Sequence, residues 1–299
     1  MLQLRHKFVL KTVSYYTGHV NAHRFTPTVE VELCGHATLA AAHALYYTKR
    51  VPALQPITFQ TVYIGTLTAV GLTDGTIELN FPVTPVTPVE LSPELRASLR
   101  GALSISDEEI LSTGKSIYDL VVEVPRATFA RLAGTSIDFA KICEQGGRAV
   151  LVTTLGGARA PAVDISALKP TPARTPQASV VNDTRFDFLS RAFVPRYHTS
   201  SALVLWLHLA DVFCCGYVLC CRYGINEDPV TGSAHCALAP YWTDRIRAIA
   251  GGTAETAAPL TLVGCQASGR TGVISVTVDG DRVRLAGHSV VTMRSKVLV

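Results

Sequence analysis

The spacing of hydrophobic residues changes several times along the chain, and each change predicts a different element. Residues 8–13 and 20–25 run apolar or alternate with polar residues, as β-strands do. From Ala37 to about residue 50, alanine and leucine recur at helical spacing, and a Val-Pro pair then provides a stop signal. The first fifty residues therefore predict two strands followed by a helix.

The remaining chain repeats this alternation. Strands are predicted at 57–62, 65–72, 76–81, 116–124, 149–154, 261–263, 272–278 and 282–286. Helices are predicted at 92–100, 126–132 and 234–249, the first of them with a Ser-Pro start. A proline- and alanine-rich stretch, 161–176, is expected to be irregular. Each half thus contains strands and one central helix that follows a glycine turn, which indicates a weak internal repeat.

Two stretches, 31–45 and 227–239, join a turn, a glycine and an Ala-rich helix. The glycines are Gly35 and Gly232. The first backbone N–H groups of a helix have no intrahelical partner, and the helix dipole is positive at that end. The two turns therefore predict two helix starts that are suited to binding an anion.

Composition and charge narrow the class of protein. The 299 residues are 48% hydrophobic, enough for two medium domains or one large one. The net charge of +4 is scattered, which disfavours nucleic-acid binding. The first residues lack the apolar region of a signal peptide, so a cytoplasmic location is expected. Four of the eight cysteines fall within 214–221 and none has zinc-finger spacing, so we expect reduced thiols and no metal.

Three segments together carry a family resemblance. They are RFTP (24–27) leading to LCGHAT (33–38), GINEDPVTGSAH (224–235) and QASGR (266–270). The chain resembles the PhzF-like, or phenazine biosynthesis-like, family, which shares the fold of diaminopimelate epimerase. The resemblance implies an α+β fold of two similar domains, each a strand-rich, barrel-like sheet wrapped around a central helix. We expect an N-terminal domain at 1–113, to which 288–299 returns, and a C-terminal domain at 114–287.

The resemblance also implies a chemistry: a proton shift on a small carboxylated substrate in the cleft between the domains, without metal or organic cofactor. It assigns catalytic roles to His36, Asp228 and Ser233, and substrate-binding roles to Gly35, Ala37, Thr231, Gly232 and Arg270. Physical chemistry agrees with these roles, because histidine gives and takes protons near neutral pH and arginine binds carboxylates through two hydrogen bonds.

Each residue alone also has a structural interpretation. His36 and Ser233 are ordinary residues of a helix start, Asp228 precedes a proline in a turn, and a surface arginine is often simply solvated. Their joint occurrence on two matching turns favours the functional interpretation. Cys34 stands at the place of a catalytic thiol in the related epimerases, but Thr231 replaces the second thiol, so a two-thiol racemase is not expected.

The N-terminus departs from the family. Members carry an additional first strand and helix and a catalytic glutamate in a segment that coincides here with residues 5–8, where Arg5 takes the place of the glutamate. Glu30 and Glu32 share one face of a strand and offer another carboxylate. The N-terminal domain is therefore expected to be incomplete, and a fragment, a misassigned start and an inactive relative all stay open. The uncovered sheet edge favours a homodimer.

A second departure is an apolar insertion at 196–223, close to the roughly 20 residues of a membrane helix. His208 and Asp211 in its centre disfavour membrane insertion. An extra helix, an interaction patch and translated non-coding sequence remain as interpretations.

Two functional hypotheses follow. The first is a cofactor-independent isomerase of the PhzF-like type. The alternative is a catalytically impaired homologue or fragment that acts as a small-molecule-binding or interaction protein.

Overall fold

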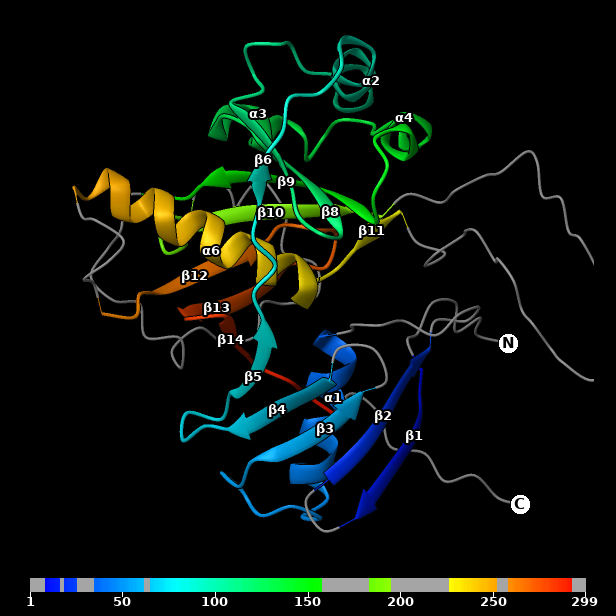
Figure 1. Cartoon of the computed structure of the whole chain (residues 1–299), viewed down its shortest axis with the longest axis vertical. Coiled ribbons are helices and arrows are strands. Elements are labelled where there is room, and N and C mark those ends of the chain that lie inside the picture. Colours follow the sequence, from blue (N-terminus) through cyan, green and yellow to red (C-terminus); the bar gives the residue numbers. More distant parts are fainter. Residues whose placement is uncertain are drawn as a thin grey trace, which may run out of the picture.

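The structure is a computed structural model that describes residues 9–16, 19–25, 35–61, 65–157, 183–194, 226–251 and 258–291, with backbone alone for 9–25 (Figure 1). Arg5, Glu30, Glu32, Cys34, the stretch 161–176 and the whole insertion at 196–223 lie outside these residues. Among the helices of the described residues, none is long and apolar enough to cross a membrane.

The described residues form a mixed α+β fold, as predicted. Its helices are α1 (Gly35–Tyr47), α2 (Pro93–Leu103), α3 (Arg126–Arg131), α4 (Phe139–Glu144) and α6 (Gly232–Ile249). Its strands are β1 (Val9–Tyr16), β2 (His19–Phe25), β3 (Ile57–Thr61), β4 (Gly65–Gly71), β5 (Ile77–Pro82), β6 (Thr87–Pro88), β7 (Ser112–Lys115), β8 (Asp119–Glu123), β9 (Ala149–Leu155), β10 (Phe188–Phe193), β11 (Glu227–Asp228), β12 (Thr261–Gln266), β13 (Gly272–Asp279) and β14 (Arg282–Gly287).

One continuous sheet runs through the described residues in the order β1-β2-β3-β4-β5-β14-β13-β12-β10-β9-β8-β7-β6, with β11 paired to β10. The predicted meander β3-β4-β5 is confirmed as antiparallel. The turn before β5 is closed by Asp74 Oδ1, which accepts from the Thr76 N–H at 2.8 Å, and Gly75 has a φ of +83°. Only a residue that tolerates positive φ fits there.

Strand β5 then pairs with β14, about two hundred residues further along the chain. Arg282 reinforces this pairing by donating from Nε to Asn80 Oδ1 at 2.6 Å. In Figure 1 the lower part of the molecule contains β1–β4 and α1, and the upper part contains α6 and the strands beside it. The β5–β14 pair connects the two parts. The domain boundary at 113/114 remains a prediction, since sheet hydrogen bonding continues across both halves.

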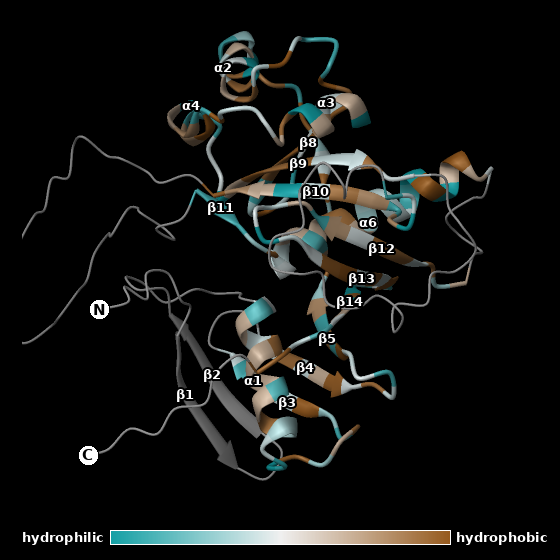
Figure 2. Cartoon of the chain, turned by 180° about the vertical axis from the view of Figure 1, so that it is seen from behind, coloured by the Kyte–Doolittle hydropathy of each residue, from teal (hydrophilic) through white to brown (hydrophobic). Residues whose placement is uncertain are grey.

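Strand β9 explains why some segments are apolar without alternation. Val150 and Val152 belong to a core cluster that includes buried side chains of α2, α3 and α4, whereas Ala149 and Leu151 belong to a cluster shared with α1 and α6. Both faces of the strand are therefore buried, which favours a continuous apolar run. In Figure 2 strands β9, β12 and β13 are mostly brown, as this burial requires.

Helix α6 continues through Pro240, which has no N–H to bond the Cys236 carbonyl. That carbonyl accepts instead from the Thr84 N–H, at 3.2 Å, on the connection that follows β5. Ser92 caps α2 as predicted, because its Oγ accepts from the Leu95 N–H at 3.3 Å. The structure thus satisfies helical backbone groups with partners from distant segments as well as local ones.

Candidate functional site

The N-termini of α1 and α6 meet at the two predicted glycines. A Cβ atom added to Gly35 would lie 2.9 Å from the Gly232 Cα, and a Cβ atom on Gly232 would lie 2.9 Å from the Gly35 Cα. Backbone atoms of helices cannot move aside as the end of a flexible side chain can. Glycine is therefore required on both sides of this contact, for closeness rather than for an unusual φ.

A cavity of about 530 Å³ opens beside this contact. It is lined by residues of α1, the start of α6 and the turn before it, β5, the 270–274 segment, and the end of β14 with the residues that follow: Gly35, His36, Leu39, Leu79, Val230, Gly232, Arg270, Thr271, Gly272, Val273, Ile274, Leu285, Ala286, Gly287, His288, Ser289 and Val290. Among these described lining residues none is acidic, and the titratable ones are His36, Arg270 and His288. The lining is mostly apolar and includes the exposed, positively charged Arg270, which suits a small anionic ligand.

Asp228, at the end of β11, is not among the lining residues of this cavity, although Val230 and Gly232, which follow it in the chain, are. It is only 6% exposed, and its Oδ2 accepts from the Thr231 hydroxyl at 2.7 Å. Its Oδ1 is buried and has no hydrogen-bond partner in the part of the chain that the structure describes. Burial raises the pKa of the Asp228 carboxyl above its ordinary value, whereas the charge of His36 and the Thr231 hydroxyl oppose that rise.

An ion pair fixes the strand that carries Asp228. Arg191 of β10 donates from Nε to Glu227 Oε1 at 2.7 Å and from Nη2 to Oε2 at 3.0 Å, and its Nη1 donates to the Leu132 carbonyl at 2.7 Å. The Arg191 side chain is 9% exposed and that of Glu227 is 19% exposed. Because Ala192 pairs with Asp228 in the ladder, this buried pair positions the carboxyl through the backbone.

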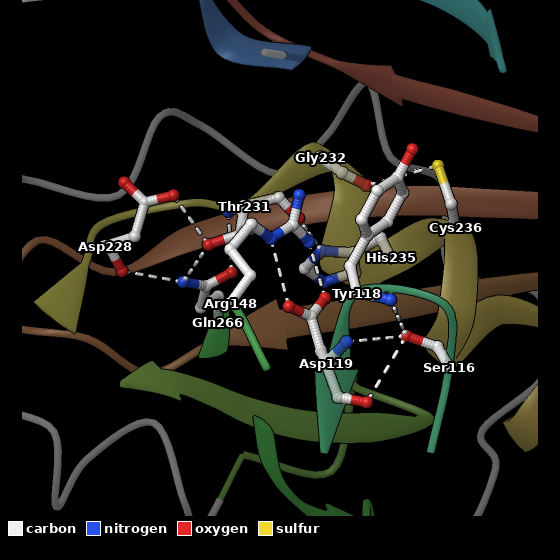
Figure 3. A network of polar contacts seen from close by, with 10 residues as sticks. All are labelled: Ser116, Tyr118, Asp119, Arg148, Asp228, Thr231, Gly232, His235, Cys236 and Gln266. Carbon is white, nitrogen blue, oxygen red and sulfur yellow. Dashed lines mark hydrogen bonds and ion pairs between the residues drawn. The ribbon is translucent and has the colours of Figure 1, made fainter. Parts of the chain in front are cut away.

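Figure 3 shows the polar network around Asp228. Gln266 of β12 bonds to the backbone of both Asp228 and Thr231, and His235 donates from Nδ1 to the Thr231 carbonyl at 2.8 Å. Burial lowers the pKa of His235 to about 4, so this histidine is neutral at pH 7. We therefore interpret His235 as structural.

The predicted site residues fall into two groups, those that line the cavity and those that do not. Gly35, His36, Gly232 and Arg270 line the cavity. The buried Asp228 and the partly buried Thr231 are joined by their hydrogen bond and are not among the described lining residues. Ala37 and Ser233 are buried in the first turns of their helices and, in the described structure, are not among the lining residues.

Sequence reasoning missed several residues of this region. The sequence predicts no site role for Gln266, for His288 or for the Arg191–Glu227 pair. Gln266 and Glu227 stand in the segments that carry the family resemblance, but only as part of the motif. A glutamine in an otherwise apolar strand was a usable signal, since a buried amide needs partners. In the described ranges, no three His, Cys, Asp or Glu side chains gather as ligands for a metal ion.

Comparison with solved structures defines the class of fold. The described fold is shared with a PhzF-family protein from Enterococcus faecalis, with a TM-score of 0.62 and 24% identity over 92% of this chain and 77% of the other. A putative PhzC/PhzF protein from Clostridium difficile gives a TM-score of 0.64 and 22% identity over 96% and 82% of the two chains. Both likenesses establish the fold, which is that of phenazine biosynthesis proteins.

A family model described as phenazine biosynthesis-like protein matches residues 6–201 and 209–295. The chain belongs to this family. It is 30% identical to an uncharacterised isomerase of Halalkalibacterium halodurans over 92% of this chain and 77% of the relative. It is 28% identical to an uncharacterised isomerase of Pseudomonas aeruginosa over 91% of this chain and 76% of the relative. These relatives support a general isomerase type of function.

Proposed function

We propose that the protein is an isomerase that shifts a proton on a small carboxylated metabolite, without a cofactor, in the cavity where α1 and α6 meet. The site would then lie between the proposed domains 1–113 and 114–287. The observation that carries the proposal is the Gly35–Gly232 contact beside a cavity whose described titratable lining residues are His36, Arg270 and His288. A volume of about 530 Å³ suits a metabolite-sized ligand.

The roles follow from position. Backbone N–H groups around Gly35, Ala37 and Gly232 would hold the substrate carboxylate, because helix starts attract anions. Arg270, an exposed lining residue, would add a charge-assisted hydrogen bond. This mode of binding leaves the apolar walls to contact the rest of the substrate.

Proton transfer is assigned to His36 and Asp228. His36 lines the cavity and its charge acts on the Asp228 carboxyl, so the two groups are electrostatically coupled. Burial favours the protonated carboxyl, which suits an acid, and His36 would act as the base once its imidazole has given up its proton. Ser233, in the first turn of α6, would donate a hydrogen bond from its hydroxyl to the substrate. Thr231 would hold the Asp228 carboxyl through the hydrogen bond from its own hydroxyl.

Deuterium exchange tests the proposal. A panel of small amino, hydroxy and unsaturated cyclic carboxylic acids is incubated with the protein in D₂O, and loss of carbon-bound proton signals is followed by ¹H NMR. We expect enzyme-dependent exchange in at least one acid, reduced about 10²-fold or more by His36→Asn and by Asp228→Asn. His43→Asn is the matched control, because His43 lies on the same helix and is not among the described lining residues.

A second function has an observation of its own. No described lining residue is a carboxylate, and Asp228 is buried and not among them. This arrangement favours a binding or interaction protein that retains the cleft but not the full chemistry. Saturable binding of a carboxylic acid of the panel, with no exchange in any of them, would support this alternative and contradict the isomerase.

The homodimer and the cytoplasmic location remain predictions. The mass of the protein in solution, measured by light scattering, tests the first. A single 32 kDa species would contradict the dimer.

A further inference from the structure

Gln266, the last residue of β12, is fully buried and makes three hydrogen bonds with one side chain. Its Oε1 accepts from the Thr231 N–H at 2.8 Å. Its Nε2 donates to the Asp228 carbonyl at 2.7 Å and lies 3.2 Å from the Thr231 hydroxyl oxygen, to which it also donates. All three bonds go to the two ends of the turn that carries the Asp228 carboxyl (Figure 3).

The bonds occupy the groups that would otherwise close this turn. In an ordinary four-residue turn, the carbonyl of the first residue accepts directly from the N–H of the fourth. Here the first residue is Asp228 and the fourth is Thr231, and the amide of Gln266 bonds to both groups. The side chain therefore stands in for the missing partner at each end of the turn.

The amide also directs the only hydroxyl proton of Thr231. Because Gln266 Nε2 donates to the hydroxyl oxygen, the proton of that hydroxyl remains for Asp228 Oδ2, 2.7 Å away. A threonine at a helix N-cap ordinarily accepts from a first-turn N–H instead. Among the described residues Thr231 makes no such capping bond, although it is the N-cap of α6.

We propose that Gln266 is a positioning residue of the site, which holds the Asp228–Thr231 turn and commits the Thr231 hydroxyl to the Asp228 carboxyl. Its meaning for catalysis rests on the proposed isomerase. The same commitment leaves the N–H groups of the α6 start uncapped by Thr231, on the side where Gly232 meets Gly35. The Gln266 amide thus affects both the buried Asp228 carboxyl and the start of α6.

A purely structural role for Gln266 would affect stability alone, so the test needs a readout at Asp228. The full chain is labelled with [γ-¹³C]aspartate, the Asp228 signal is assigned with Asp228→Asn, and its titration is followed by NMR. Gln266→Met keeps the volume and removes all three bonds. We expect the Asp228 midpoint to rise by about 0.5–1 pH unit, because the carboxylate loses the hydroxyl directed at it. Thr231→Val should give the same rise.

Thr153→Val is the matched control. It removes the buried hydroxyl that donates to the Leu189 carbonyl at 2.7 Å and accepts from Trp242 Nε1 at 2.9 Å. It should destabilise the protein and leave the Asp228 midpoint unchanged. If Gln266→Met does not fold, Gln266→Asn replaces it, since the shorter amide cannot reach both ends of the turn, and the same rise is expected.

An unchanged Asp228 midpoint in the folded Gln266 variant overturns the proposal, as does an equal rise in Thr153→Val. The titration requires no substrate. Absence of deuterium exchange across the panel would therefore contradict the isomerase without deciding the result for Gln266. A rise specific to Gln266 and Thr231 supports the positioning role in either case.

Discussion

Gly35→Ala perturbs the contact on which the site depends. The added Cβ would lie 2.9 Å from the Gly232 Cα, whereas ordinary contacts of a Cβ begin near 3.4 Å. The α1 and α6 starts must therefore separate by at least about 0.5 Å. No shift of a flexible side chain can relieve the overlap, because the atom it meets belongs to the backbone.

The size of the effect follows from two opposing terms. Overpacking at a close contact costs about 1–3 kcal/mol. Replacing glycine by alanine in a helix returns about 0.4–1 kcal/mol, because the unfolded chain loses conformational freedom. We expect Gly35→Ala to lower the free energy of unfolding by about 1–2 kcal/mol. Gly232→Ala, which meets the Gly35 Cα at the same distance, should cost about as much.

Urea unfolding followed by circular dichroism measures this loss. Gly101→Ala is the matched control: Gly101 lies within α2, and its added Cβ would meet the flexible end of Lys141 at 3.1 Å. That variant should be neutral or stabilised by up to about 1 kcal/mol. A Gly35→Ala protein as stable as the Gly101→Ala protein would refute the close contact between the two helix starts.

Three further predictions test the surroundings. Arg191→Leu removes the partner of Glu227, whose side chain is only 19% exposed, and should lower the free energy of unfolding by about 3 kcal/mol, the lower end of the loss for a buried pair. Arg131→Leu breaks a pair whose arginine is half exposed and should cost much less; equal losses in urea unfolding would contradict the stabilisation by the Arg191–Glu227 pair. Burial lowers the pKa of His235 from its ordinary 6.5 to about 4 in the folded state, so the unfolded chain binds more protons between these two pH values, and stability should fall as pH falls through that window. His235→Asn should remove this pH dependence, worth about 3 kcal/mol between its ends, and an unchanged slope of unfolding free energy against pH would count against a buried neutral histidine. Arg270→Gln should weaken binding of a carboxylic acid from the panel about 10-fold or more in calorimetry, while Arg50→Gln, at an exposed position outside the described cavity lining, should not.

Local sequence patterns predict most of the helices and strands. The strands of the meander, the Ser92 start of α2 and the two glycine-led helices all depend on residues close in sequence, and periodicity reports such residues directly. The glycines at 35 and 232 were selected from their motifs as well, although their reason, a backbone contact between two helices, appears only in three dimensions.

The features that local patterns do not predict depend on partners distant in sequence. The β5–β14 pairing joins strands about two hundred residues apart, and the alternation of either strand is equally compatible with other neighbours. Two of the three bonds of Gln266 go to backbone groups of Asp228 and Thr231, which carry no side-chain signal. The cavity-lining position of His288 arises at the end of β14 for the same reason. No local rule reports which segment will supply a partner.

The proposed function has the helix starts at Gly35 and Gly232 hold the carboxylate of the substrate. Its most direct test is an NMR titration of the [¹⁵N]glycine-labelled protein, with Gly35 and Gly232 signals assigned by alanine substitution, against the acid that shows exchange or binding. We predict saturable shifts of both amide signals, with no comparable shift at Gly101 or Gly134. Saturation of binding with the Gly35 and Gly232 signals unmoved would contradict the account.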